Sequence, residues 1–142
     1  METSSANGQA PWGVTGEKDE DMGLDTYPSR GPGECVLTPE DEAALAELGL
    51  PLCGFGLHAS FRGKVYEDVV NRVTGGARSL YELWMPPEGV AEMAAAFEAC
   101  DPEAVAQASK GDYYPATADE VRALRRLFRL FADLGLGLYA DV

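Results

Sequence analysis

The feature that most constrains the fold is the segment 117–135, near the carboxyl end of the chain. It opens with Thr117-Ala-Asp-Glu120, a capping box in which each outer side chain accepts a hydrogen bond from the other residue's backbone N–H. Apolar residues then recur every three or four positions: Val121, Leu124, Leu127, Phe128, Phe131 and Leu134. Gly135 supplies a left-handed stop. This pattern predicts a long amphipathic helix, whose apolar face has to be buried against the rest of the chain.

Three more segments carry a proline in the first helical turn, where its missing N–H costs nothing. They begin at Pro39, Pro86-Pro87 and Pro102. In the first of them, Thr38 is the expected N-cap and Gly49 the expected left-handed stop. A further helix is predicted over 64–73, ended by Gly75-Gly76. The expected inward-facing residues of these helices are Ala44, Leu45, Leu48, Val65, Val69, Val70, Val73, Val90, Met93, Ala94 and Phe97.

Strands are predicted at two places, a short one over 57–61 and a terminal one over 136–140. Residues 79–85 are predicted to form one or two buried helical turns. The stretch 23–37, rich in glycine and proline, is predicted to be an irregular lead-in. The predicted fold class is therefore α+β, a single helix-rich domain with a small, mostly antiparallel sheet and a terminal strand.

Residues 1–21 are small, polar and acidic, with Trp12 as the only large apolar side chain. Such a segment buries too little apolar surface to offset the entropy of ordering it. We therefore predict a disordered acidic arm over 1–21, followed by a single domain over 22–142. An over-long gene start and a peptide that docks through Trp12 are the alternatives for the arm.

The net charge of −13, from 24 acidic and 11 basic residues, restricts the classes of partner. Binding of nucleic acid or of an anionic membrane surface requires an excess of Lys and Arg, so neither is expected. The chain also lacks a hydrophobic run of the roughly 18–20 residues that span a membrane, and its first residues lack the basic and apolar regions typical of a signal peptide. We expect a cytoplasmic protein, and its acidity suits contact with a basic protein partner.

The three cysteines, Cys35, Cys53 and Cys100, are widely spaced and include no CxxC pair. A disulfide framework is therefore not expected. Together with His58 they are residue types that bind zinc, but their spacing matches no compact zinc module. We predict cysteines that behave as small apolar residues, no metal and no cofactor.

Five short motifs follow one another in residues 84–142: Pro86-Pro87-Glu88, Asp101-Pro102-Glu103, Tyr114-Pro115, Leu124-Arg-Arg-Leu-Phe128 and Gly137-Leu-Tyr-Ala140. This order resembles the YfbM-like family of small bacterial α+β proteins. In that family a helix, an Asp-Pro turn, a Tyr-Pro turn, a long helix and a final strand occur in succession. The resemblance implies a fold. It implies no activity and no site residues, because the family has no agreed activity.

The stretch CGFGLHASFRGK, residues 53–64, contains the only histidine and resembles two phosphate-binding motifs. Residues 54–59 fit G-x-G-x-x-A, the spacing of a dinucleotide-binding turn. That turn requires a strand before it and a helix after it, and Pro51 and Gly63 interrupt them. The P-loop spacing is too long here, and Val65 stands where Ser or Thr would bind magnesium. We expect neither motif to operate.

Between residues 58 and 78 the chain holds four basic and two acidic residues, a local excess of positive charge. Part of this excess lies at the expected start of the helix over 64–73, where free backbone N–H groups attract anions. We predict that a small anionic ligand binds here, and the predicted site residues are His58, Ser60, Arg62, Lys64 and Arg72. The alternative is that these side chains pair with carboxylates of the same chain.

Catalytic groups are scarce. His58 would have to activate Ser60 or a cysteine, and the chain contains no G-x-S-x-G elbow. Three carboxylate pairs, Glu67/Asp68, Glu88/Glu92 and Asp119/Glu120, suit acid–base chemistry, but solvated helix faces are expected in so acidic a chain. Tyr81, Trp84, Tyr113 and Tyr114 are expected to pack in the core, with a pocket lining as the alternative. Arg122, Arg125, Arg126 and Arg129 are expected to contact an acidic partner or the chain's own carboxylates.

Two classes of function remain. The first is a non-catalytic interaction protein of the inhibitor or immunity type, whose acidic surface covers a basic partner. The second is a binder of a small anionic ligand, or a minor enzyme, that uses the cationic segment from His58 to Arg72. We favour the first, without enzymatic activity, because the net charge and the missing catalytic signature agree with it.

Overall fold

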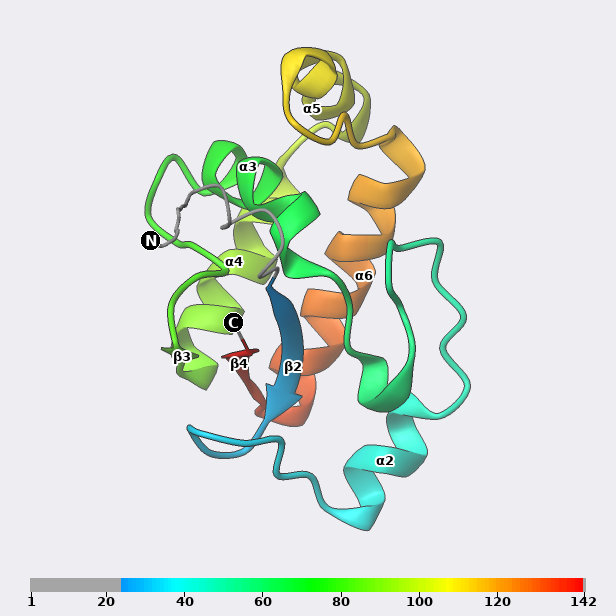
Figure 1. Ribbon diagram of the computed structural model, residues 1–142, viewed down its shortest axis with the longest axis vertical. Helices are drawn as coiled ribbons and strands as arrows, with labels where there is room; N and C mark the ends of the chain where they lie inside the picture. Colours follow the sequence, from blue (N-terminus) through cyan, green and yellow to red (C-terminus); the bar gives the residue numbers. More distant parts are fainter. Residues whose placement is uncertain (1–23, 142) are drawn as a thin grey trace, which may run out of the picture.

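Helix α6 (Ala118–Leu134) is the longest element of the structure, a computed structural model that describes residues 24–141. It packs along α4 (Pro87–Ala99), and the two helices lie side by side through the middle of the molecule (Figure 1). The other helical elements are α2 (Pro39–Leu45), α3 (Gly63–Val73), α5 (Pro102–Ala108) and the 3-10 turns η1 (Leu57–Ala59) and η2 (Ser109–Gly111). Helices α5 and α2 lie at opposite ends of the long axis (Figure 1).

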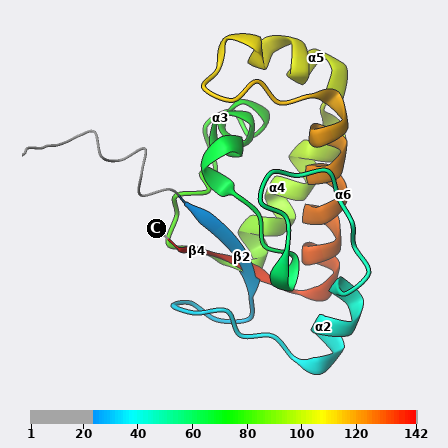
Figure 2. The ribbon, with the colours of Figure 1, turned by 45° about the vertical axis from the view of Figure 1, so that its right-hand side comes forward.

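Three strands form a small antiparallel sheet in the order β2-β4-β3. They are β2 (Asp25–Ser29), β3 (Trp84–Met85) and β4 (Gly137–Asp141), so the terminal strand lies in the centre. Alternate residues point inward and are buried, among them Thr26, Met85 and Leu138. Helix α4 contacts β4 and β3, and Figure 2 shows the helices on one side of the sheet.

The predicted fold class, α+β with a small antiparallel sheet, is confirmed. Helix α6 has the predicted capping box, and Gly135 ends it with φ of 74°. Gly75 and Gly76 follow α3 with positive φ, as predicted. The arm predicted over residues 1–21 lies outside the described residues. None of the described helices is both long and apolar enough to cross a membrane.

Several local predictions are wrong. Two of the aromatic residues expected in the core, Tyr81 and Tyr113, are exposed, at 47% and 69%. The irregular lead-in contains β2, where Pro28 is tolerated because this strand lies outside the central position of the sheet. Residues 79–85 form a turn that ends in β3 instead of helical turns, and residues 57–59 form η1 instead of a strand. Helix α2 ends at Leu45, so Gly49 is not its left-handed stop and Ala44 is exposed.

The core is built around aromatic side chains from both halves of the chain. The Phe128 ring of α6 lies between two others, with ring centroids 5.1 Å from Phe97 of α4 and 6.1 Å from Phe61. The ring centroid of Tyr66, on α3, lies 6.0 Å from that of Phe61. Such tilted and edge-to-face pairs add about 0.5–1.5 kcal/mol each beyond the burial of their area.

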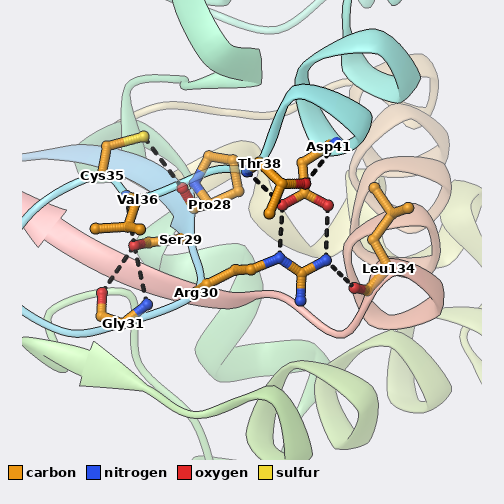
Figure 3. A network of polar contacts seen from close by, with 9 residues as sticks. All are labelled: Pro28, Ser29, Arg30, Gly31, Cys35, Val36, Thr38, Asp41 and Leu134. Carbon is orange, nitrogen blue, oxygen red and sulfur yellow. Dashed lines mark hydrogen bonds and ion pairs between the residues drawn. The ribbon is translucent and has the colours of Figure 1, made fainter.

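Arg30 joins three elements at the end of the molecule that carries α2 (Figure 3). Its Nε and Nη2 donate to the two carboxylate oxygens of Asp41, at 2.6 and 2.7 Å, and Nη2 also donates to the Leu134 carbonyl at 2.9 Å. Asp41 is buried and closes a capping box with Thr38. Arg30 therefore joins the first turn of α2 to the C-terminal carbonyl of α6. The Asp41 carboxylate suits the positive end of the α2 dipole, and the Arg30 cation suits the negative end of the α6 dipole.

Asp41 makes stability dependent on acid. The hydrogen bond from Arg30 lowers the pKa of this carboxyl from 3.8 to about 2, although burial opposes the shift. The resulting stabilisation, roughly 2 kcal/mol, is present above the pKa that Asp41 has in the unfolded chain and is lost as the pH falls through about 2.

Asp41→Asn should remove this contribution to the difference in unfolding free energy between pH 6 and pH 2, measured by urea denaturation. Glu47→Gln, on an exposed residue beyond α2, should retain it, and an equal loss in both variants would contradict the assignment.

Gly63 permits the close approach of α3 to β2. A Cβ atom at this position would lie 2.0 Å from Thr26 Oγ1 and 3.2 Å from Leu24 Cδ2. Thr26 is buried, and its hydroxyl has no hydrogen-bond partner among the described residues. The hydroxyl therefore occupies the space that a side chain at residue 63 would need.

Gly63→Ala should destabilise the protein by about 2 kcal/mol, the usual scale of an overpacking clash. Most of that loss should be recovered in the double variant with Thr26→Ala, because the obstructing hydroxyl is then gone. Gly111→Ala is the control, since nothing lies within 4 Å of a Cβ there. Urea midpoints are measured for the unaltered chain, both single variants, the double variant and the control. An additive double variant would show that the two residues do not meet.

Candidate functional site

Three of the five residues predicted to bind an anion each contact a different carboxylate. The contacts are His58 Nδ1 to Glu42 Oε2 at 2.9 Å, Arg62 Nη1 to Asp25 Oδ1 at 3.4 Å and Arg72 Nη2 to Asp112 Oδ1 at 3.0 Å. These carboxylates lie on α2, β2 and the turn after η2. These three side chains therefore pair with carboxylates of the same chain, which was the alternative to anion binding.

The other two predicted residues face the protein itself. Ser60 is buried, and the Lys64 ammonium lies over the Tyr113 ring, 5.7 Å from its centroid. The Lys64 N–H donates to the Leu24 carbonyl at 3.1 Å. The N-terminus of α3 therefore faces β2. The anion site itself stays a prediction, because no contact with a ligand bears on it.

The loop before α3 holds two non-glycine residues in the left-handed region, His58 and Ala59, each with φ of 59°. This conformation costs about 1–2 kcal/mol per residue. Backbone hydrogen bonds across the loop maintain it, among them Gly56 N–H to Ser60 O at 3.0 Å and Arg62 N–H to Cys53 O at 2.9 Å. The result is that the imidazole of His58 turns onto Glu42, sixteen residues earlier in the chain.

A pocket of about 390 Å³ lies beside this contact, between α2 and η1. Glu42 and His58 provide its ionisable groups, and leucine and alanine side chains provide most of the remaining lining. Sequence analysis singled out His58 and missed Glu42, because the two come together only when α2 folds against the loop.

A buried carboxylate joins two tyrosines at the start of α6. Glu120 closes the capping box and also accepts hydrogen bonds from the hydroxyls of Tyr66 and Tyr114. Burial, followed by the bond to Glu120, raises the pKa of Tyr66 well above its ordinary value. The Tyr66 hydroxyl in turn accepts a bond from the Cys53 N–H at 2.8 Å. This network secures α3, α6 and the loop at Cys53, and its inaccessibility favours a structural role.

The groups weighed for metal chemistry lie in different places. Cys35 donates its thiol to the Pro28 carbonyl at 3.3 Å, and Cys100 donates to the Phe97 carbonyl at 3.1 Å, while Cys53 is exposed. Burial raises the pKa of both Cys35 and Cys100. Within residues 24–141 no three His, Cys, Asp or Glu side chains are placed to hold one metal ion.

Two of the four arginines on α6 pair with carboxylates of the same chain. Arg122 contacts Glu103 at 2.7 Å, and Arg129 contacts Glu98 at 2.7 Å.

The three carboxylate pairs weighed for acid–base chemistry have members that bind other residues of the chain. Glu92 pairs with Arg78, and Asp119 pairs with Arg122. Glu67 accepts hydrogen bonds from Asn71, Ser79 and Leu80. None of these pairs forms an isolated acid–base site.

The outward side of the sheet carries a row of three aromatic residues, of which sequence analysis weighed only Trp84, as a core or pocket residue. Tyr27 of β2 pairs in register with Tyr139 of β4, which pairs in turn with Trp84 of β3, and all three are half-buried. The two tyrosine rings are 6.1 Å apart. The Trp84 indole lies over Gly137, where a Cβ atom would come within 2.6 Å of the ring.

Two carboxylates stand at the end of this row. Asp25 of β2 and Asp141 of β4 are directly opposite each other in the register. Burial raises the pKa of the neighbouring Tyr27, and the charges of both aspartates raise it further, so they lie close to its ring. We call the five residues Asp25, Tyr27, Trp84, Tyr139 and Asp141 the acidic aromatic face. Its signals in the sequence were the alternation in residues 24–27 and the terminal strand predicted over 136–140.

Comparison with known proteins gives no match: no family model, no curated protein and no solved structure is similar to this chain. The resemblance of residues 84–142 to the YfbM-like family therefore stays a prediction. Any function has to be argued from the site geometry alone.

The left-handed conformation of His58 can be tested by comparing two truncations. Both His58→Ala and His58→Gly remove the imidazole, but alanine at a positive φ is strained, so the glycine variant should be more stable by roughly 1 kcal/mol. At the neighbouring Leu57, which lacks a positive φ, the order should reverse, with Leu57→Ala the more stable. Thermal or urea denaturation gives the comparison, and an alanine variant at residue 58 that equals glycine would contradict the conformation.

Proposed function

We propose that this chain is a non-catalytic interaction protein whose acidic aromatic face binds a basic segment of a partner protein. The observation that carries the proposal is the cross-strand pair Asp25 and Asp141 beside Tyr27 and Tyr139. Like charges directly opposite each other destabilise a sheet. A bound cation would remove that repulsion.

The aromatic part of the face suits the same partner. Arginine and lysine side chains are attracted to the faces of tyrosine and tryptophan rings, by about 0.5–1 kcal/mol at exposed sites. Tyr27, Tyr139 and Trp84 offer three adjoining half-buried rings. A guanidinium group bound there would also donate hydrogen bonds to the carboxylates of Asp25 and Asp141, which its planar array of donors suits.

The distribution of ion pairs supports a basic partner over an acidic one. Arg62 already contacts Asp25, at a long 3.4 Å, whereas Asp141 has no ion-pair partner among the described residues. Other arginines are paired within the chain, namely Arg30, Arg72, Arg78, Arg122 and Arg129. With a net charge of −13, the surplus that remains is acidic. Long-range attraction would therefore increase the rate of association with a basic protein.

A defined peptide tests this proposal. The probe is a short peptide of two arginines separated by glycines, and its control replaces arginine with the uncharged analogue citrulline. Amide and indole NMR signals of the full chain should shift with the arginine peptide at residues 25–27, 84 and 137–141, and salt should weaken binding. The citrulline peptide should cause little change.

Two variants assign the binding to this face. Asp141→Asn and Tyr139→Leu should each weaken peptide affinity by about three- to fivefold, since each removes up to roughly 1 kcal/mol. Glu88→Gln changes the net charge by the same amount as Asp141→Asn on an exposed residue of α4, and it should leave the affinity unchanged. Equal weakening by Glu88→Gln and Asp141→Asn would mean general charge attraction and would contradict the proposal.

A further inference from the structure

The pocket between α2 and η1 is separate from the acidic aromatic face and has the features of a small-molecule site. Its volume of about 390 Å³ lies in the range of such sites. The lining residues are Glu42, Leu45, Ala46, Leu48, Gly56, Leu57, His58 and Ala59. A mainly apolar wall with a few polar groups at one side is the usual composition of a ligand pocket.

The polar side of the pocket consists of hydrogen-bond acceptors. His58 Nδ1 lies 3.0 Å from Glu42 Oε1 and 2.9 Å from Oε2, so Nδ1 carries the proton and donates it to the carboxylate. In the neutral imidazole Nε2 is then an acceptor. Glu42 is 46% exposed, which leaves its oxygens lone pairs for a second donor. A ligand therefore has to bring donors.

The charge of the lining decides the sign of the ligand. Glu42 is negative, and His58 is the one lining residue able to become positive. When His58 is protonated the pair is neutral, and otherwise the pocket is negative. A carboxylate or phosphate group would be repelled by a negative pocket and would gain no net attraction from a neutral one. An ammonium group would form charge-assisted hydrogen bonds to Glu42.

The apolar wall requires an aliphatic part in the ligand. Leu57, at the rim, has 76% of its surface exposed, and Leu48 is half-buried. Covering these side chains with a hydrocarbon chain removes apolar surface from water, which favours binding. The left-handed His58 and Ala59 hold this wall and the Glu42 contact in place before any ligand arrives, so little ordering would be needed on binding.

We propose that this pocket binds a small aliphatic amine, with its ammonium group on Glu42 and His58 Nε2 and its hydrocarbon chain on Leu48 and Leu57. This ligand class is opposite in charge to the anion predicted from the sequence for His58. The proposal does not depend on the proposed partner, because it concerns a different surface.

The test compares three probes of equal chain length on the full chain, namely hexylamine hydrochloride, 1-hexanol and sodium hexanoate. Amide signals of residues 42–48 and 56–59, and the His58 ring signals, follow binding by NMR. Hexylamine should bind saturably and at least tenfold more tightly than hexanoate, with hexanol between them. Equal affinity for hexylamine and hexanoate, or no saturable shift with hexylamine, would overturn the proposal.

Two variants and one matched control locate the amine. Glu42→Gln should weaken hexylamine binding about tenfold and leave hexanol binding unchanged. Leu57→Ser, at an exposed position where folding is not at risk, should weaken hexylamine and hexanol alike. Glu47→Gln alters the net charge equally at an exposed residue outside the pocket and should have no effect. If Glu47→Gln weakened hexylamine binding as much as Glu42→Gln, the amine would not occupy this pocket.

Discussion

The burial of one face of α6 is the constraint on which the rest of the structure depends. That face is apolar beyond the buried Glu120 at its start, and Phe128 at its middle contacts rings from the α4 helix and from residue 61. Because a helix of this kind is unstable in water unless its apolar face is covered, α4 and α5 pack on it, and α4 in turn contacts β4 and β3. The two ends of α6 are then secured by polar contacts: Glu120 receives two tyrosine hydroxyls, and Arg30 binds the Leu134 carbonyl.

The electrostatics of the molecule follow from how its few cations are used. Arginines are largely engaged with the chain's own carboxylates, either at exposed pairs worth little or at the buried Asp41. What remains on the surface is acidic. The proposed partner surface and the proposed amine pocket both use acceptor groups, and the nearest arginine contact at the first is the long one of 3.4 Å between Arg62 and Asp25. They differ in shape, since one is a sheet face and the other a concavity.

Both proposed sites lie where local rules are broken. Asp25 and Asp141 oppose each other across two strands, and His58 and Ala59 adopt a conformation that favours glycine. Departures of this kind cost stability, and in natural proteins they gather at functional positions. Several glycines, by contrast, suit their positions: Gly63 gives room to Thr26, Gly137 lies under Trp84, and Gly135 has the positive φ that its place requires.

The sequence by itself determined the α-helices and most of their ends, because a capping box, a first-turn proline or a terminal glycine acts within a few residues. The end of α2 at Leu45, well before Gly49, is the exception. Thr117 with Glu120, and Gly75 with Gly76, needed no knowledge of the rest of the fold. Only the tertiary structure decided the strands β2 and β3 and the candidate sites. Asp25 meets Asp141, and Glu42 meets His58, across long separations in the chain. Such pairings depend on the register of the sheet and on the packing of α2 against the loop, and both are set by burial of the common core.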